Sequence, residues 1–529
     1  MSTHDIVLRG GRLVDGTNSP WIRGDLALTD GRIAAAGDVP GDGAVEIEVT
    51  GSVVAPGFID IHTHSDFTLP ANREAHSKVR QGVTTEIVGN CGTSAAPAYG
   101  EVATDVAEGF AYRGVGDVVD VEWASVADYL DHLEGEGVSL NVGTLIGHEN
   151  ARIAAVGYED REPTTDELAE MKAIVDEAMA DGAVGLSTGL IYTPGAFADT
   201  DEIVELASVV AEHGGLYATH MRSEGDDIFA ALEEAIEIGC RADVPVQISH
   251  HKAVGRDNWG KVRYTLRRME RARAEEGVDV QCEQYPYVAS STSLKARLPT
   301  WARDGGPEAL MDRLTDAETR AQLREELEAY TDDWDDILLT NVRNPELADC
   351  EGKTLAELAD HPDEDRDPAT LSLDLLIEDE LRTRQVSFCM DEDDVEFVMA
   401  HPLTMVGSDG NSLRTDGPLG EGVPHPRSYG TFPRVLGHYV REKGVLSLET
   451  AVHKMTGRPA ARLGLDDRGV LKAGAYADVT VFDPDTVGEA GSFTEPSIYA
   501  DGIEHVLVNG EFVVRDGDHT GERPGVALR

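Results

Sequence analysis

The segment "TTDELAEMKAIVDEAMADGAVGLSTGL", Thr164 to Leu190, places a helix signal directly before a strand signal. A threonine cap opens the predicted helix, and Gly182 stops it. The residues "AVGLSTGL" that follow predict a strand. A helix that leads into a strand across a short turn is part of a βαβ unit, from which parallel sheets are built.

The same helix–strand order repeats through the middle of the chain. The helix signal "DTDEIVELASVVAEHGG" precedes the strand "LYATHMR", and "DIFAALEEAIEIGCRADV" precedes "PVQISHHK". Further strands are predicted in residues 52–64, 82–92, 279–287 and 403–411. Strand–helix units over roughly 400 residues predict an α/β fold, a (β/α)8 TIM-like barrel with functional groups at the carboxyl ends of its strands.

The two ends of the chain have a different texture, with short alternating strands around Asp-Gly and Asn-Gly turns, as in "IEHVLVNGEFVVRDGD". We therefore expect a small β-sandwich domain built from both termini, residues 1–55 plus 466–529. The barrel then takes residues 56–295 plus 396–465. Residues 296–395 are rich in helix signals and acidic residues, and they predict a helical insertion that lies over the site as a lid. A chain of 529 residues is long enough for several domains.

The charge balance is strongly acidic, with 98 Asp and Glu against 45 Lys and Arg and a net charge of −53. Such a surface repels nucleic acids and anionic membranes, so neither is expected as a partner. The pattern resembles that of proteins from halophiles that accumulate salt, because high ionic strength screens the self-repulsion. We expect stability to depend on salt.

Neither a membrane span of about 18 apolar residues nor a secretory signal is found, so the expected location is cytoplasmic. The five cysteines are scattered and lack CxxC spacing, which argues against a disulfide framework. The oligomeric state does not follow from the sequence.

Candidate metal ligands stand at successive predicted strand ends. His62 and His64 lie at i and i+2 on a strand, so both side chains point to one face. His220 ends "LYATH", His250 ends "PVQISH", and Asp409 follows the apolar run "LTMVGS". Taken singly, a His-X-His pair is a weak signal, a lone histidine is more often structural, and Asp-Gly is more often a turn. Together they indicate a metal centre.

This order of His-X-His, His, His and Asp resembles the amidohydrolase superfamily, whose ligands hold one or two divalent metals, usually zinc. Most binuclear members bridge the metals with a carboxylated lysine on a middle strand. Between Arg80 and Gln247 this chain has a single lysine, Lys172, on a predicted helix, and the relevant strand offers Ser187 and Thr188 instead. Cys91 in "GNCG" could be a buried spacer, a nucleophile or a ligand. The missing lysine favours an anionic zinc ligand.

Within the superfamily the chain resembles the D-aminoacylases, or N-acyl-D-amino-acid deacylases. The matching blocks are "GFIDIHTHSD", "GVTTEIVGNCG", "GLSTGLIYTPG", "THMRSEGD", "SHHKAVGRDNWGK", "QYPYVASST", "VGSDGN", "HPRSYGTFPRVLGHYVRE", "MTGRPAARLGL" and "TGERPGVALR". The resemblance implies a tight zinc site at Cys91, His220 and His250. It implies a second, weaker metal position at His62, His64 and Asp409.

The implied reaction is hydrolysis of the amide bond of a small N-acyl-D-amino acid, with Asp409 as general base and then acid toward a zinc-activated water. A substrate carboxylate needs fixed positive charge or strong donors, for which the candidates are Lys252, Arg427, Tyr285 and Tyr287. Tyr192 is a candidate for the pocket wall. The alternatives are a cyclic-amide hydrolase of the hydantoinase or dihydroorotase type, which usually needs the absent lysine, and a non-catalytic metal-binding protein of the same fold.

Overall fold

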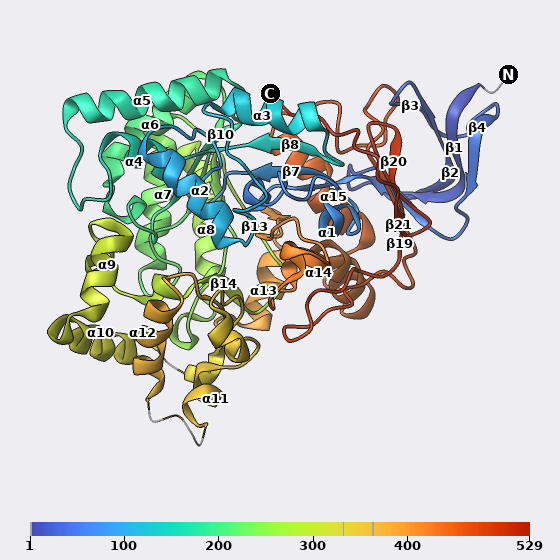
Figure 1. Ribbon diagram of the computed structural model, residues 1–529. Helices are drawn as coiled ribbons and strands as arrows, with labels where there is room; N and C mark the ends of the chain where they lie inside the picture. The colour runs from blue at the N-terminus through green and yellow to red at the C-terminus, as the bar shows by residue number, and fades with distance from the viewer. Residues whose placement is uncertain (1–2, 332, 362–363, 365) are drawn as a thin grey trace.

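The computed structural model describes residues 3–331, 333–361, 364 and 366–529. Parallel strands surrounded by helices form its centre, a β domain lies at one side, and a helical insertion lies at the opposite lower corner (Figure 1). Helix α5 (Thr165–Ala180) has the predicted start, because Thr164 and Glu167 form a reciprocal capping box. It runs into β10 (Gly185–Gly189) past Gly182, whose φ of 108° suits glycine.

The central strands form a closed barrel, which confirms the predicted fold. In chain order they are β6 (Phe58–Asp60), β7 (Val83–Val88), β8 (Asn141–Thr144) with its continuation β9 (Ile146–Gly147), β10, β11 (Leu216–His220), β12 (Val246–Ile248), β13 (Val280–Gln284) and β17 (Thr404–Val406). Each pairs in parallel with its neighbours. The ring closes just past β6 and β17, where Asp409 N donates to His62 O and His64 N donates to Gly410 O.

Helices connect these strands and cover the barrel from outside, as the repeated helix–strand order predicts. They are α1 (His76–Val79), α2 (Glu101–Tyr112), α3 (Val126–Glu136), α4 (His148–Ala155), α5, α6 (Thr200–Glu212), α7 (Ile228–Ala242), α8 (Val262–Arg271), α13 (Glu392–Ala400), α14 (Arg427–Arg434), α15 (Leu448–Met455) and α16 (Gly457–Arg462). The barrel strands are buried along their length, because helices cover them on the outside and side chains fill the inside.

Strands from both chain ends meet in one nine-stranded sheet. Its strands are β1 (His4–Leu13), β2 (Ile22–Thr29), β3 (Arg32–Gly37), β4 (Gly43–Glu48), β5 (Val53–Pro56), β18 (Val479–Phe482), β19 (Ile503–Val508), β20 (Glu511–Arg515) and β21 (Asp518–His519). The register of β1 shifts at Gly10, so its first half pairs with β4 and its last residues pair with β5. The sheet therefore forks at this bulge.

The insertion after β13 has its own leucine-rich core and contains α9 (Gly306–Thr315), α10 (Ala317–Tyr330), α11 (Leu355–Ala359) and α12 (Pro368–Glu378). It also contains an antiparallel sheet of β14 (Ser290–Ser293), β16 (Arg384–Ser387) and β15 (Ile337–Leu339), in that order. Helix signals alone did not predict this sheet, because strands of three or four residues are too short to show alternation.

Candidate metal centre and active site

The six residues that the sequence singled out as ligands meet at one end of the barrel. His62 and His64 follow β6, Cys91 follows β7, His220 ends β11, His250 follows β12 and Asp409 follows β17. All six come from the carboxyl ends of strands, which a barrel gathers around its axis.

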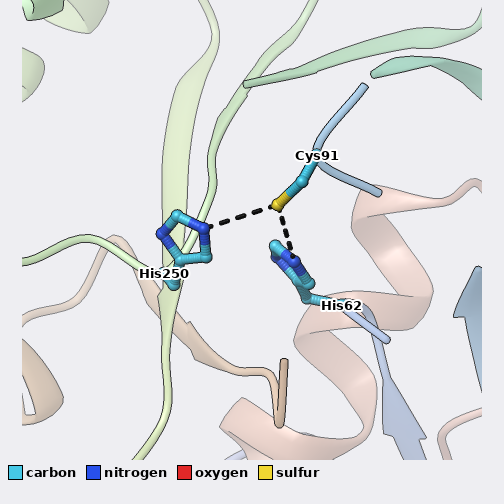
Figure 2. A group of neighbouring side chains, drawn as sticks. All are labelled: His62, Cys91 and His250. Carbon is cyan, nitrogen blue, oxygen red and sulfur yellow. Dashed lines mark hydrogen bonds between the residues drawn. The ribbon is translucent and has the colours of Figure 1, made fainter. Parts of the chain in front are cut away.

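The Cys91 thiol lies at the middle of this group. Its Sγ is 3.4 Å from His62 Nε2 and 3.5 Å from His250 Nε2, the contacts drawn in Figure 2. His220 Nδ1 is 3.9 Å from the same sulfur. Three imidazole nitrogens thus face one thiol.

Asp409 extends the group on the other side of His62. Its Oδ1 is 3.1 Å from His64 Nε2 and 3.6 Å from His62 Nε2. Two sets therefore share His62, one with Cys91 and His250 and one with His64 and Asp409, and in each set the ligand atoms lie within 4.8 Å of one another. The spacing fits two adjacent cation positions.

Three of these residues have unusual backbone conformations. Cys91, His250 and Asp409 have φ values of 56°, 34° and 52°, in the left-handed region that residues with a Cβ rarely adopt. Such conformations cost about 1–3 kcal/mol each and persist where the surroundings hold them. Here they turn three side chains from different strands toward one point.

Glu283 on β13 orients two of the histidines. Its Oε1 is 2.7 Å from His62 Nδ1 and accepts a 2.8 Å hydrogen bond from the backbone N of His250, and its Oε2 accepts from the Gln247 amide. With Nδ1–H donating to Glu283, the Nε2 lone pair of His62 faces Cys91. A carboxylate behind a histidine ligand fixes its tautomer and strengthens it as a ligand.

Glu224 lies behind the other two histidines, where Lys252 Nζ is also 2.7 Å from His250 Nδ1. Its carboxylate is 3.0 Å from His250 Nδ1 and 3.5 Å from His220 Nε2, on the sides that face away from Cys91. Sequence reasoning missed both glutamates. A usable signal existed for Glu283 alone, because a charged residue within a buried strand needs a partner.

Ser187 lies on the strand where a bridging lysine would be expected. Its Oγ accepts from Gly92 N at 3.0 Å and donates to Gly89 O at 2.5 Å, so it holds the loop that carries Cys91. Lys172 is on the outside of the barrel, paired with Glu205 on α6. Ser187 on β10 thus supports the loop that carries Cys91.

The protonation states of His220, His250 and Asp409 suit a cation, whereas at His62 the effect of burial is outweighed by Cys91, Glu283 and Asp409, which raise the pKa well above its ordinary value. Burial keeps the pKa of His220 and of His250 well below the ordinary value, so both imidazoles are neutral and keep a lone pair. Burial opposes ionisation of Asp409, but the Arg427 guanidinium together with the neighbouring histidines outweighs it, so the pKa lies well below its usual range. Burial raises the pKa of Cys91, and a cation would reverse this by stabilising the thiolate. One thiol, imidazoles and a carboxylate form a donor set that fits zinc.

A cavity of about 1290 Å³ opens over this group. Lys252, Tyr285, Arg427 and Tyr192 line it together with Cys91, His220, His250 and Asp409. Lys252 Nζ donates to Glu224 at 2.5 Å, and Arg427 Nη1 donates to Asp409 Oδ2 at 2.6 Å.

The two predicted tyrosines lie in different places. The Tyr285 hydroxyl is buried and has no hydrogen-bond partner within the described ranges, and its ring lies under the Arg427 guanidinium. Tyr287 does not line the cavity. It packs against His425 and Phe493, with ring centroids 5.0 and 6.1 Å apart. The ring of Tyr192 packs edge-on against His220, 5.1 Å away.

Known proteins resemble this chain over its whole length. Residues 45–514 match the model of the amidohydrolase family. D-aminoacylase of Alcaligenes xylosoxydans xylosoxydans is 42% identical over 99% of this chain and 97% of that protein. The crystal structure of N-acyl-D-glutamate deacylase from Bordetella bronchiseptica, complexed with zinc and a phosphonate mimic of the tetrahedral intermediate, has 38% identity and a TM-score of 0.83 over 99% of both chains. A D-aminoacylase structure that addresses the role of a binuclear metal centre has 38% identity and a TM-score of 0.81, over 99% of this chain and 100% of that one.

Proposed function

The chain belongs to the amidohydrolase family and, within it, to the D-aminoacylases, and from this we propose that it is a metal-dependent hydrolase of N-acyl-D-amino acids. The products are a carboxylate and a free D-amino acid. One observation carries the proposal: Cys91, two of the histidines that face its sulfur (His220 and His250) and Asp409 line one cavity in a chain 42% identical to a D-aminoacylase.

We propose zinc as the resident metal, with Cys91, His220 and His250 at the tight position. The second, weaker position takes His62, His64 and Asp409. The contacts of His220 and His250 with Cys91 Sγ and of His64 with Asp409 Oδ1 support this division. His62 Nε2 is within reach of both positions, which supports adjacent sites.

A bound zinc ion supplies an acidified water and polarises the amide carbonyl. Asp409 is ionised and close to His62 and His64, so it is placed to take a proton at Oδ1 and pass it to the departing nitrogen. Arg427 holds the other oxygen, Oδ2, which keeps the carboxylate oriented. Burial of the site excludes bulk water and strengthens these interactions.

Lys252, Tyr285 and Arg427 are proposed to bind the substrate α-carboxylate, and Tyr192 to form the wall beside His220. All four line the cavity, and the Tyr285 hydroxyl is free to donate. Arg427 has guanidinium nitrogens beyond the one that holds Asp409. The position of Tyr287 behind His425 makes it a packing residue in this proposal.

The surroundings of the enzyme are also a proposal. We propose that the insertion is the lid of the cavity, because many residues of the insertion line that cavity.

None of the described helices is long and apolar enough to cross a membrane. All five cysteines are free, which supports a reducing compartment such as the cytoplasm. The net charge of −53 supports a compartment with a high salt concentration. Equal melting temperatures of the protein in 0.1 M and in multimolar KCl would contradict this proposal.

The direct test is steady-state kinetics with matched N-acetyl-D and N-acetyl-L amino acids in high KCl, before and after chelation. We expect turnover of D-substrates, loss of turnover with chelator, and recovery with zinc. Absence of turnover with every D-substrate would remove the proposed activity.

A further inference from the structure

Three arginines converge where the insertion meets the barrel. Arg113 follows α2, Arg343 lies beyond β15 and Arg384 begins β16. Arg113 and Arg384 line the large cavity, and all three line a small pocket beside it. The pocket and the cavity share Asn411 and Arg427, so this arginine cluster adjoins the reaction centre.

The side chains of the arginine cluster contact mainly neutral groups. Arg113 donates to Asn411 Oδ1 at 3.4 Å and Gly109 O at 3.0 Å, and Arg343 Nε donates to Tyr112 O at 3.2 Å. The Arg384 guanidinium lies over the Tyr112 ring, 5.4 Å from its centroid. Within the part of the chain that the structure describes, these three have no carboxylate oxygen within 4.0 Å. In a chain with 98 acidic residues, such a group is unexpected.

Two of the acidic residues around the cluster are engaged by other donors, whereas Asp66 lies near Arg113 and Glu421 near Arg343 without a direct ion pair. Asp379 Oδ1 accepts from the backbone N of Arg343 and of Asn344, and its Oδ2 accepts from the Thr383 hydroxyl. Glu351 accepts from the backbone N of Val342. These carboxylates hold the loop rather than pair with the guanidinium groups.

Half-buried guanidinium groups that no carboxylate contacts directly can bind an anion. Burial lowers the pKa of Arg113 to about 10; nearby Asp66 opposes this shift, and Arg384 and Arg343 add to it. The Tyr112 hydroxyl beside them is buried and, among the described residues, has no hydrogen-bond partner. Unpaired guanidinium groups with a free hydroxyl form a ready receptor for a carboxylate, which arginine binds through two parallel hydrogen bonds.

We propose that Arg113, Arg343 and Arg384 bind a second carboxylate of the substrate, in addition to the one attached to the α-carbon. The proposal rests on the proposed function. It deepens that function, because it selects dicarboxylic N-acyl-D-amino acids among all N-acyl-D-amino acids. The second carboxylate is on the amino-acid side chain or at the far end of the acyl group. Because Arg343 and Arg384 belong to the insertion and Arg113 to the barrel, the bound carboxylate also joins the two.

Two matched substrate pairs test the proposal and distinguish the two sources. N-acetyl-D-glutamate is compared with N-acetyl-D-glutamine, and N-succinyl-D-alanine with N-butyryl-D-alanine, at constant KCl. We expect wild-type kcat/KM to favour the charged member of one pair by about 10–100-fold, as for loss of a hydrogen bond to a charged group. Equal kcat/KM within both pairs would overturn the proposal.

Variants then assign the preference to the arginine cluster. Arg384→Gln should abolish the preference by lowering kcat/KM for the charged member much more than for the neutral member. Arg382→Gln is the matched control, because Arg382 lines the same cavity but pairs with Glu380. Arg384→Gln that lowers both members equally would mean a structural role and would contradict the proposal.

A binding measurement separates this inference from the proposed function. Glutarate should raise the melting temperature of the wild type but not of Arg384→Gln, at constant ionic strength and whether or not any substrate is hydrolysed. Inorganic phosphate that stabilises the wild type as much as glutarate would mean a general oxyanion site and would overturn the dicarboxylate assignment. No shift with glutarate would also overturn it.

Discussion

The metal centre and the arginine cluster line neighbouring parts of one cavity but differ in how their side chains are held. At the metal centre, Glu283 holds His62 and Arg427 holds Asp409. In the arginine cluster, the Arg384 guanidinium lies over the face of Tyr112, 5.4 Å from the ring centroid. The first group is pre-organised on barrel strands, whereas the second lies between the barrel and the insertion.

We relate this difference to two tasks, the chemical reaction at the metal centre and the choice of substrate at the arginine cluster. Groups that act on the bond need fixed geometry, which the strand ends and the buried glutamates provide. Groups that select the substrate can stay unpaired until a substrate binds. A substrate without the matching group is then rejected, because it leaves the protein charge without a partner. Variants at the metal centre should therefore reduce activity toward every substrate. Variants in the arginine cluster should mainly reduce activity toward dicarboxylic substrates.

Cys91→Ala should have the largest effect, because it removes the central anionic ligand. We expect loss of the tightly held metal and loss of activity by at least about 10³-fold, since catalysis depends on the cation. Metal content and turnover are measured together. Cys282→Ala is the control, because Cys282 is also buried but contacts only Leu403 and Thr404 through its sulfur. A Cys91→Ala protein that keeps metal and activity would make the cysteine a packing residue.

Asp409→Asn should keep the tightly bound metal and lose its general base. The expected fall in kcat is on the order of 10²–10⁴-fold, the usual contribution of a positioned acid or base. Metal analysis and kcat on the same preparation check this. Turnover equal to wild type with bound zinc would refute the role of Asp409.

Glu283→Gln should weaken the centre less, because it changes orientation rather than a ligand. Metal affinity or activity should fall by about 10–100-fold, as is common for groups behind a histidine ligand. Chelator competition gives the affinity. Unchanged affinity together with unchanged activity would show that His62 needs no such support.

A substitution at Glu149 should have the smallest effect. One oxygen of this buried carboxyl accepts a hydrogen bond from Thr93, as at the metal centre, and the other has no partner within the described residues, as in the arginine cluster. Burial raises its pKa to about 8. The native state therefore keeps a proton that the unfolded chain loses near the ordinary value of 4.5, so the free energy of unfolding falls as pH rises from about 4.5 to 8. Glu149→Gln should flatten this fall in thermal melts at pH 5 and 8. An identical pH dependence in both proteins would contradict the assignment.

Much of the fold could be predicted because its signals are local. The Thr164 cap and the Gly182 stop bound α5, and similar helix–strand junctions recur around the barrel. The insertion sheet could not be predicted, since Ser290–Ser293 carries no apolar alternation and pairs with Arg384–Ser387, far along the chain. Its partners are fixed by tertiary packing.

The residues of the site also divide into those that the sequence could predict and those that it could not. His220 and His250 could be placed because each ends a recognisable strand, and the structure brings them to Cys91. Glu283 could not be linked to His62, which is 221 residues away, without the closed barrel. The arginine cluster was missed for a related reason: an unpaired charge becomes visible only when every neighbour is known.

The most direct test of the account measures release of free D-amino acid from N-acetyl-D-amino acids by the zinc-loaded, the chelated and the zinc-restored protein, with L-isomers and hydantoins assayed in parallel. The account predicts turnover of D-substrates only, lost on chelation and restored by zinc. Turnover of hydantoins without turnover of any N-acetyl-D-amino acid would contradict it.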